Sequence, residues 1–408
     1  MKILYNKISE SIKVRNTYIG MSVFDEPFIA LFSLLSFILA IDLNATPFQV
    51  AVLVSLRPIV SLFTFYWSAN LKRQEDKLVT NLMGAWFIGR VPFLFMPFFT
   101  SVWSIIFAVG VFHLFSRAST PALMEILRQN FEKQEREKLV SRVYLLKFIE
   151  SGIFAVVFGS MLDLSPSIWK WLIACFALLS ISTLILQRRI KINPTAPVAS
   201  VPKGFNRVTQ PWKDSFELLA KRKDFARFQM GFMIGGFALM MVSAVLPYYF
   251  KGLCLTHETI CYGKNLWMGV GVFASTFIWQ RILNHYSIEK VMSLMLLGFF
   301  CFPLTLILAS SSFSFFYIAF FCYGFCQAGS HLLWNLSGPY FSNQEESSSF
   351  TTVNIHMIGL RGLIAPFLGV YLYNQLGAQI TLIISSIICL IGAGYMFVSK
   401  KSVIKKTA

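Results

Sequence analysis

The sequence has few charged residues and lacks the common motifs of nucleotide and metal chemistry. Only 13% of its 408 residues are Asp, Glu, Lys or Arg. It contains no glycine-rich phosphate loop with its lysine, no HExxH motif, and no group of Cys and His at metal-ligand spacing. These absences exclude ATP-driven pumping by this chain alone. We expect no enzyme activity, no catalytic residues, no metal and no cofactor.

Apolar residues dominate instead, at 56% of the chain, with 16% aromatic. A helix needs about 20 such residues to cross about 30 Å of hydrocarbon. The apolar runs lie near 18–41, 48–68, 78–99, 102–127, 142–162, 168–187, 225–250, 265–284, 290–309, 313–341, 350–374 and 377–399. The sequence therefore predicts an all-α membrane protein with twelve transmembrane helices, with the lipid bilayer as its surroundings.

The net charge of +17 lies in alternate loops and not on one soluble face, which argues against nucleic acid as a partner. The residues on one side are Lys2, Lys7, Lys13, Arg15, Lys72, Arg73, Lys77, Arg128, Lys133, Arg136, Lys138, Arg142, Lys400, Lys401, Lys405 and Lys406. By the positive-inside rule this side faces the cytoplasm. We expect both termini inside, in the plasma (inner) membrane, and a first span that is retained and not cleaved as a signal peptide.

One long polar segment, residues 188–224, divides the spans into six and six. Transporter folds are commonly built from such repeats. The sequence predicts an N-terminal six-helix bundle over 1–187, a cytoplasmic central loop over 188–224, and a C-terminal six-helix bundle with a short tail over 225–408. The segment "WKDSFELLAKRK" late in the loop is amphipathic.

The two halves can be aligned without a gap at an offset of 210 residues, which places Phe115 on Phe325. The fifth and eleventh spans then share the pattern Gly-x-x-Ala-x-x-x-Gly, which puts small residues on one helix face and allows close approach of another helix. We expect helix packing or gating there, with a proline as a kink in the second copy. The residues are Gly152, Ala155, Gly159, Gly362, Ala365, Pro366 and Gly369.

With these features the chain resembles the major facilitator superfamily over its whole length. The stretch "RGLIAPFLG" looks like the glycine and proline motif that this family usually carries in the fifth span, and which is associated with antiporters. The family's cytoplasmic motif after the second span is poorly kept, because Ser68 and Lys72 stand where Gly and Asp are expected, while Arg73 and Lys77 are retained. The resemblance implies two pseudo-symmetric six-helix bundles in a divergent branch of the family, and it implies no substrate.

Arginines within the spans are candidates for function, since an ionisable group in a membrane helix is unfavourable unless it faces a cavity or a partner. Arg57 and Arg361 lie near the middle of their spans, and Arg117 lies nearer the cytoplasm. Together they would make a clamp for a carboxylate or phosphate group. The alternative is that each pairs with a carboxylate and holds helices together, which is our interpretation of Arg90.

The tenth span carries a polar stripe, since Gln327, His331 and Asn335 recur every four residues on one helix face. The repeat aligns Gln327 with Arg117 and Asn335 with Glu125. We expect the stripe to contact substrate, although a lone histidine can also be a packing residue with one hydrogen bond.

Coupling to protons requires an acid within the membrane, and Glu125 and Glu150 are the candidates. Glu150 can instead form a local ion pair with Lys147, one turn before it. Asp25 and Glu26 precede Pro27, so they are either buried acids or the N-cap and first turn of a helix.

Cys254 and Cys261 lie in the loop after the seventh span and can form a disulfide in an oxidising compartment or remain thiols.

Taken together, the sequence predicts a secondary transporter that works by alternating access. We expect proton-coupled uptake of a small anionic or zwitterionic solute by a monomer. Two alternatives remain: efflux of amphipathic compounds by an antiporter, and a membrane receptor or scaffold that keeps the fold without transport.

Overall fold

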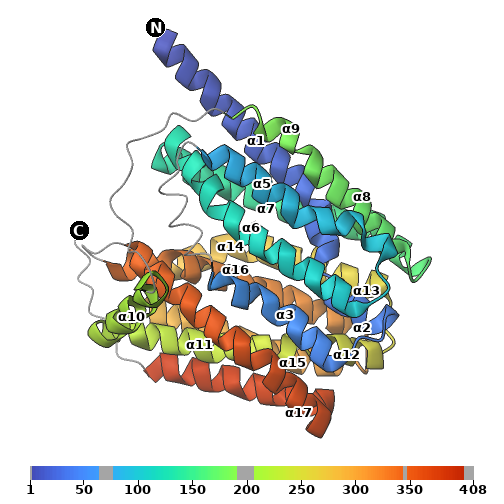
Figure 1. Ribbon diagram of the computed structural model, residues 1–408. Helices are drawn as coiled ribbons and strands as arrows, with labels where there is room; N and C mark the ends of the chain where they lie inside the picture. Colours follow the sequence, from blue (N-terminus) through green and yellow to red (C-terminus); the bar gives the residue numbers. More distant parts are fainter. Residues whose placement is uncertain (1, 64–76, 191–205, 343–346, 399–408) are drawn as a thin grey trace. The chain divides into compact units, whose positions relative to one another are not determined.

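The computed structural model describes residues 2–63, 77–190, 206–342 and 347–398, which form helices joined by turns and contain no strand (Figure 1). The predicted motif after the second span falls almost entirely outside these ranges. Eight of the described helices are long and apolar enough to cross a membrane, and Pro47–Ser61 is a shorter apolar helix. An all-α membrane fold is thereby confirmed.

The chain divides into two compact units. Unit 1 comprises Met1–Ala45, Ile59–Arg207 and Thr256–Cys261, and unit 2 comprises Thr46–Pro58, Val208–Leu255 and Tyr262–Ala408. Two segments thus belong to a different unit from their neighbours in the sequence. One is most of α3 (Pro47–Ser61), whose Ala51 packs with Ala244 and Val370 in unit 2. The other is Thr256–Cys261, where the carboxylate of Asp163 accepts hydrogen bonds from the backbone N–H groups of His257 and Glu258, at 2.9 and 3.0 Å.

In unit 1, α1 packs against α7 and α8, and α5 packs along α6 (Figure 1). The helices of this unit are α1 (Lys2–Phe32), α2 (Leu35–Asp42), α5 (Leu78–Leu94), η2 (Met96–Phe98), α6 (Val102–Asn130), α7 (Lys133–Phe158), η3 (Ser160–Asp163), α8 (Ile168–Ser182), α9 (Leu184–Gln187) and α13 (His257–Cys261). Helix α1 continues through Pro27, so Asp25 and Glu26 lie inside a helix and do not cap one. A proline is tolerated there because membrane helices satisfy the freed backbone groups locally.

In unit 2, α17 packs against α11 and α15, while α16 packs against α14 and α15. The helices of this unit besides α3 are α10 (Asn206–Lys221), α11 (Lys223–Ser243), α12 (Leu246–Gly252), η4 (Tyr262–Trp267), α14 (Met268–His285), α15 (Ile288–Leu308), α16 (Ser314–Ser342) and α17 (Ser347–Val398). Helix α17 covers the spans expected at 350–374 and 377–399. Gly377, with φ 81° and ψ 172°, breaks it between them, a conformation that glycine adopts without strain.

The described part of the central loop is also helical. Helix α10 packs onto unit 2 through Leu218 and Leu219, and Trp212 stacks on His356 with ring centroids 4.1 Å apart. Ser215 lies 2.7 Å from Nδ1 of the same histidine. The amphipathic end of the loop is therefore part of the folded unit.

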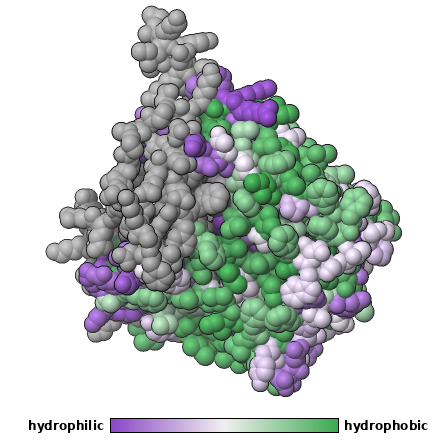
Figure 2. Space-filling view, in the orientation of Figure 1, coloured by the Kyte–Doolittle hydropathy of each residue, from purple (hydrophilic) through white to green (hydrophobic). Residues whose placement is uncertain are grey.

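The surface of both units carries many large apolar side chains, such as Phe98 and Phe107, each 73% exposed, and Leu164, 74% exposed. Figure 2 shows hydrophobic residues over much of the visible face, with hydrophilic residues gathered toward its borders. Such exposure is unfavourable in water and favourable against lipid tails. Such apolar surface is suited to contact with lipid.

Candidate functional site

Unit 2 encloses a cavity of about 220 Å³ between α11, α15, α16 and α17. Its polar lining residues are Ser243, Tyr323, Gln327, Ser330 and Arg361. The remaining lining residues are Phe232, Gly235, Gly236, Leu239, Met240, Met295, Leu296 and Phe299. Among the described residues that line it there is no Asp, Glu, Lys or His, so its one formal charge is the guanidinium of Arg361.

Arg361 lies on α17 and is only 8% exposed. Its Nη1 donates a 2.8 Å hydrogen bond to the carbonyl oxygen of Phe232, and its guanidinium carbon lies 5.2 Å from the centre of the Phe232 ring. Its Nε is buried and has no hydrogen-bond partner. Within the described ranges no carboxylate lies within ion-pair distance of it. A buried guanidinium held by one carbonyl can accept an anionic group as its missing partner.

Two adjacent glycines on α11 make room for this arrangement. A Cβ on Gly236 would overlap the guanidinium of Arg361, and a Cβ on Gly235 would overlap the side chain of Leu296. On α17, Gly362 packs against the ring of Pro58 on α3. Small residues on two helices therefore allow Arg361 to lie flat against the backbone of α11.

Helix α16 supplies the polar wall of the cavity through Tyr323, Gln327 and Ser330, which recur every three or four residues on one face. Of the predicted stripe, Gln327 lines the cavity. His331 is not among the lining residues, but its Nε2 lies 3.2 Å from Nε2 of Gln327. Asn335 is exposed, one turn further along α16.

Arg57 lies on the part of α3 that belongs to unit 2 and is exposed. Its charge acts on both Tyr323 and His331, so it lies near the α16 wall without lining the cavity. Unit 2 thus brings Arg57 and Arg361 to the same group of helices. Arg117 is half-buried on α6 of unit 1.

The two predicted coupling acids of unit 1 have different surroundings. Glu125 bonds within its own helix to Arg128, at 2.6 and 2.8 Å, and to Gln129, at 3.0 Å. Glu150 is half-buried and its Oε2 has no hydrogen-bond partner. Lys147 and Glu150 are not within ion-pair distance of each other in the described structure, although the charge of Lys147 acts on Glu150 and on a second acid.

That second acid is Glu26, which lies inside α1 and is 6% exposed. Its Oε2 has no hydrogen-bond partner, and the charges of Lys147, Asp25 and Glu150 act on it. The sequence did not decide whether Glu26 is a buried acid or part of the first turn of a helix, because the following Pro27 is also typical of a helix start. The signal that it lies in a helix interior was the unbroken apolar run on both sides.

The buried ion pair of unit 1 joins Arg90 to Asp25, which confirms the structural interpretation of Arg90. Nε and Nη2 of Arg90 donate to Asp25 at 2.8 to 2.9 Å, and Nη1 donates to the carbonyl oxygen of Trp86 at 3.2 Å. Ser180 donates a further hydrogen bond to Asp25, at 2.5 Å. Both charged groups are therefore satisfied inside the protein.

The predicted small-residue faces lie in separate units. Gly152, Ala155 and Gly159 are buried on or at the end of α7 in unit 1. In unit 2, Ala365 and Pro366 are buried, and Gly369 packs against the backbone of Met241 on α11.

Cys254 and Cys261 are thiols and not a disulfide: Cys254 is exposed and Cys261 is buried. No group of three or more His, Cys, Asp or Glu that could hold a metal ion occurs among the described residues.

The helices that can cross a membrane define the chain as an integral membrane protein. The model of the Major Facilitator Superfamily matches residues 20–354 and 265–407, and the chain belongs to this family. None of the curated proteins compared with it matches.

Solved structures share the fold at low sequence identity. A POT family transporter in complex with a thioalcohol-conjugated peptide has a TM-score of 0.75 at 10% identity, covering 94% of this chain and 95% of that chain. The nucleoside transporter NupG has a TM-score of 0.72 at 14% identity, covering 95% and 100%. The D-xylose-proton symporter has a TM-score of 0.68 at 12% identity, covering 95% and 97%. Family and fold point to a transporter and not to an enzyme.

Proposed function

We propose that this protein is a secondary transporter that takes up a small anionic or zwitterionic solute by alternating access, driven by a coupled ion, most naturally the proton. The observation that carries the proposal is Arg361, buried beside a cavity and lacking an acidic partner among the described residues. Leaving a buried charge unpaired is unfavourable by about 3–5 kcal/mol. An anionic solute in the cavity would supply the missing partner. Gln327 would add a hydrogen bond to it.

The remaining predicted contacts keep subordinate roles in this proposal. Arg57 adds positive potential near the cavity, and His331 orients Gln327. Arg117 and Asn335 stay predictions as solute contacts.

The positive-inside pattern supports cytoplasmic termini in the plasma (inner) membrane. In this proposal the transporting unit is a monomer.

Uptake into proteoliposomes tests the proposal. With an inward proton gradient, the wild type should accumulate a labelled organic anion, and Arg361→Gln should lose at least nine tenths of the initial rate. The matched control is Arg281→Gln, because Arg281 is exposed on α14 of the same unit and does not line the cavity. Equal rates in Arg361→Gln and the wild type would refute the role of Arg361. The absence of transport for every anion in both would refute uptake itself.

Coupling is tested separately at the acids of unit 1. Because Glu26 and Glu150 are the acids with unpartnered oxygens beside Lys147, while Glu125 is bonded within its own helix, we assign proton binding to the first two. Glu26→Gln should abolish accumulation above the outside concentration and leave solute exchange intact. Glu125→Gln is the control and should accumulate solute like the wild type. If Glu125→Gln abolishes accumulation and Glu26→Gln does not, the proton-binding acid is Glu125.

Efflux of amphipathic compounds is the second candidate, favoured by the aromatic and Met residues of the cavity wall, such as Phe232 and Met240. Such a protein would move lipophilic cations outward, and the charge of Arg361 would oppose their binding. Outward transport of a lipophilic cation that is unchanged in Arg361→Gln would establish this function instead.

A further inference from the structure

The charges that surround the cavity restrict the solute more narrowly than the proposed function does. Arg361 is the only charged residue among the described residues that line the cavity. An ammonium group brought into the cavity would meet this guanidinium and no carboxylate among the described lining residues. Like charges in a site of low dielectric repel each other strongly. The cavity is therefore suited to an anion and unsuited to a zwitterion.

The ring contacts fix the direction in which α16 passes along the cavity. Phe232 of α11 contacts Trp334, with ring centroids 5.8 Å apart, and Phe299 of α15 contacts Tyr323, at 5.6 Å. Tyr323 and Trp334 are three turns apart on α16, so Phe232 and Phe299 mark opposite ends of the wall. Arg361 is bonded to the carbonyl oxygen of Phe232 and thus lies at the Phe232 end.

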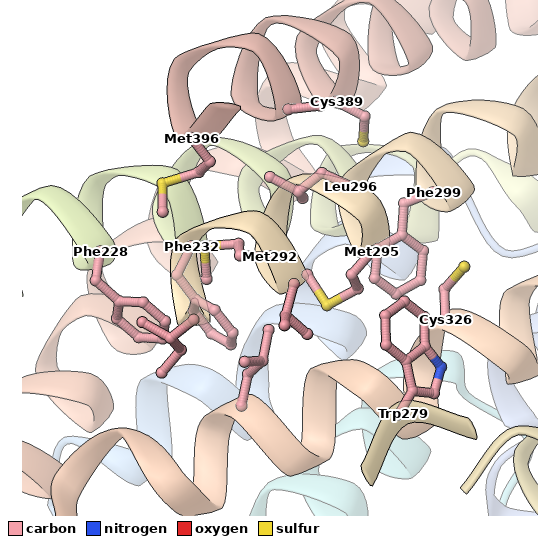
Figure 3. Packing of buried hydrophobic residues seen from close by; sticks show 14 of the residues in the cluster. Phe228, Phe232, Trp279, Met292, Met295, Leu296, Phe299, Cys326, Cys389 and Met396 are labelled. Atoms are coloured by element: carbon pink, nitrogen blue, oxygen red, sulfur yellow. The ribbon is translucent and has the colours of Figure 1, made fainter. Parts of the chain in front are cut away.

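The opposite end of the cavity is lined mainly by rings. Phe299 and Tyr323 lie there, together with Ser243, whose hydroxyl donates to the carbonyl oxygen of Met240 at 2.6 Å, and Met295 and Leu296 line the wall between the ends. Figure 3 shows Met295, Leu296 and Phe299 in the packed core of unit 2, of which Phe232 is also a member. Removing apolar surface of a solute from water there is favourable by about 25 cal/mol per Å².

The cavity can accommodate a small solute. Its volume of about 220 Å³ is enough for one ring with a short acidic arm. Gln327 and Ser330 line the α16 wall between Tyr323 and the Phe232 end and can donate hydrogen bonds to a polar group of the solute.

We propose that the solute is a small amphipathic organic monoanion. Its carboxylate-type group binds Arg361 at the Phe232 end, and its flat apolar body lies toward Phe299 and Tyr323. This inference rests on the proposed function, because it specifies the solute of the same cavity. It departs from that function by excluding zwitterions.

The test is equilibrium binding to the wild-type protein in detergent with four matched probes. 3-Phenylpropanoate carries both the ring and the anion. Phenylalanine adds only an ammonium group to it, 3-phenylpropanamide replaces the acid by a neutral amide, and propanoate lacks the ring. We expect 3-phenylpropanoate to bind at least tenfold more tightly than each of the other three probes. The comparison requires no variant, so it does not depend on how a variant folds.

A variant then connects the binding to the cavity. Arg361→Gln should weaken binding of 3-phenylpropanoate by about 30-fold, as expected when one partner of a buried charge pair is removed. Arg281→Gln should bind it like the wild type.

The other outcomes separate this inference from the proposed function. If phenylalanine binds as tightly as 3-phenylpropanoate, the monoanion class is wrong while an anionic site at Arg361 stands. If propanoate binds equally, the end lined by rings plays no part and the inference is wrong. If the amide binds equally, the anionic site and the proposed function both fail. If no probe binds, the inference is overturned, and the uptake assay alone decides the proposed function.

Discussion

Each of the two units contains an arginine buried in a membrane-spanning helix, and the two arginines have opposite surroundings. Arg90 of unit 1 is 2% exposed and donates three hydrogen bonds to the carboxylate of Asp25, with the ring of Trp86 3.5 Å from its guanidinium carbon. Arg361 of unit 2 is 8% exposed, bonds to one carbonyl oxygen and borders a cavity. Both arginines lie against aromatic rings, so what distinguishes them is the carboxylate of Asp25, which pairs with Arg90 and has no counterpart at Arg361 among the described residues.

This difference separates a structural charge from a functional one. A buried charge that is fully paired stabilises one arrangement of helices and leaves nothing for a ligand to complete. Burial of a positive charge without an acidic partner leaves part of the free energy of desolvation uncompensated. A ligand that brings an acidic group to this charge compensates it and therefore binds more tightly. From this comparison we interpret Arg90 as structural, and we propose Arg361 as the residue that binds the solute.

The largest effect is expected when the paired arginine is made to resemble the unpaired one. Asp25→Asn leaves Arg90 buried without a counter-charge and should destabilise the protein by about 3–5 kcal/mol. Thermal unfolding in detergent measures this. Glu217→Gln is the control, since Glu217 pairs with Lys221 at the surface and its loss should leave the unfolding temperature nearly unchanged. If Asp25→Asn unfolds at the wild-type temperature, Arg90 is not held as described.

A smaller effect is expected when the position of Arg361 is disturbed without changing its charge. Gly236→Ala places a Cβ where the guanidinium lies, so stability should fall by about 1–3 kcal/mol and the affinity for 3-phenylpropanoate should fall with it. The control is Gly394→Ala, because nothing lies within 4 Å of a Cβ at Gly394. In that position alanine should be neutral or stabilising by up to about 1 kcal/mol. Unchanged affinity in Gly236→Ala would mean that the solute does not bind at Arg361.

The smallest effect concerns the second cation near the cavity. Arg57 is exposed and acts at a distance, so Arg57→Gln should weaken binding of 3-phenylpropanoate by no more than about fivefold, or about 1 kcal/mol. The same titration measures it. A loss as large as that in Arg361→Gln would show that Arg57 contacts the solute directly and that the cavity has two anion sites.

The sequence was sufficient for the fold. Runs of apolar residues predict membrane helices because the bilayer leaves no alternative for the backbone. The burial of individual arginines did not follow from such runs, since Arg361 is buried and Arg57, also in an apolar run, is exposed. The sequence could not show which buried arginine is paired with a carboxylate. Arg90 and Asp25 are 65 residues apart and meet only in the fold.

Three features of the candidate site depended on packing between helices. Gly235 and Gly236 are visible in the sequence, but their roles appear only in the fold, where Gly236 lies against Arg361 and Gly235 against Leu296. Pro27 suggested a helix start at Glu26, whereas α1 passes through it. The spacing of Lys147 and Glu150 suggested a local pair, whereas in the fold the charge of Lys147 also acts on Glu26 of another helix.

The central claim is that Arg361 binds the negative charge of the solute and does more than shape the cavity. Calorimetric titration of the wild type and Arg361→Gln with 3-phenylpropanoate and with 3-phenylpropanamide isolates the charge, because the two probes have nearly the same shape. We predict that the substitution lowers the binding free energy of the acid by about 2 kcal/mol or more and that of the amide by less than about 0.5 kcal/mol. Equal losses for the acid and the amide would contradict the claim.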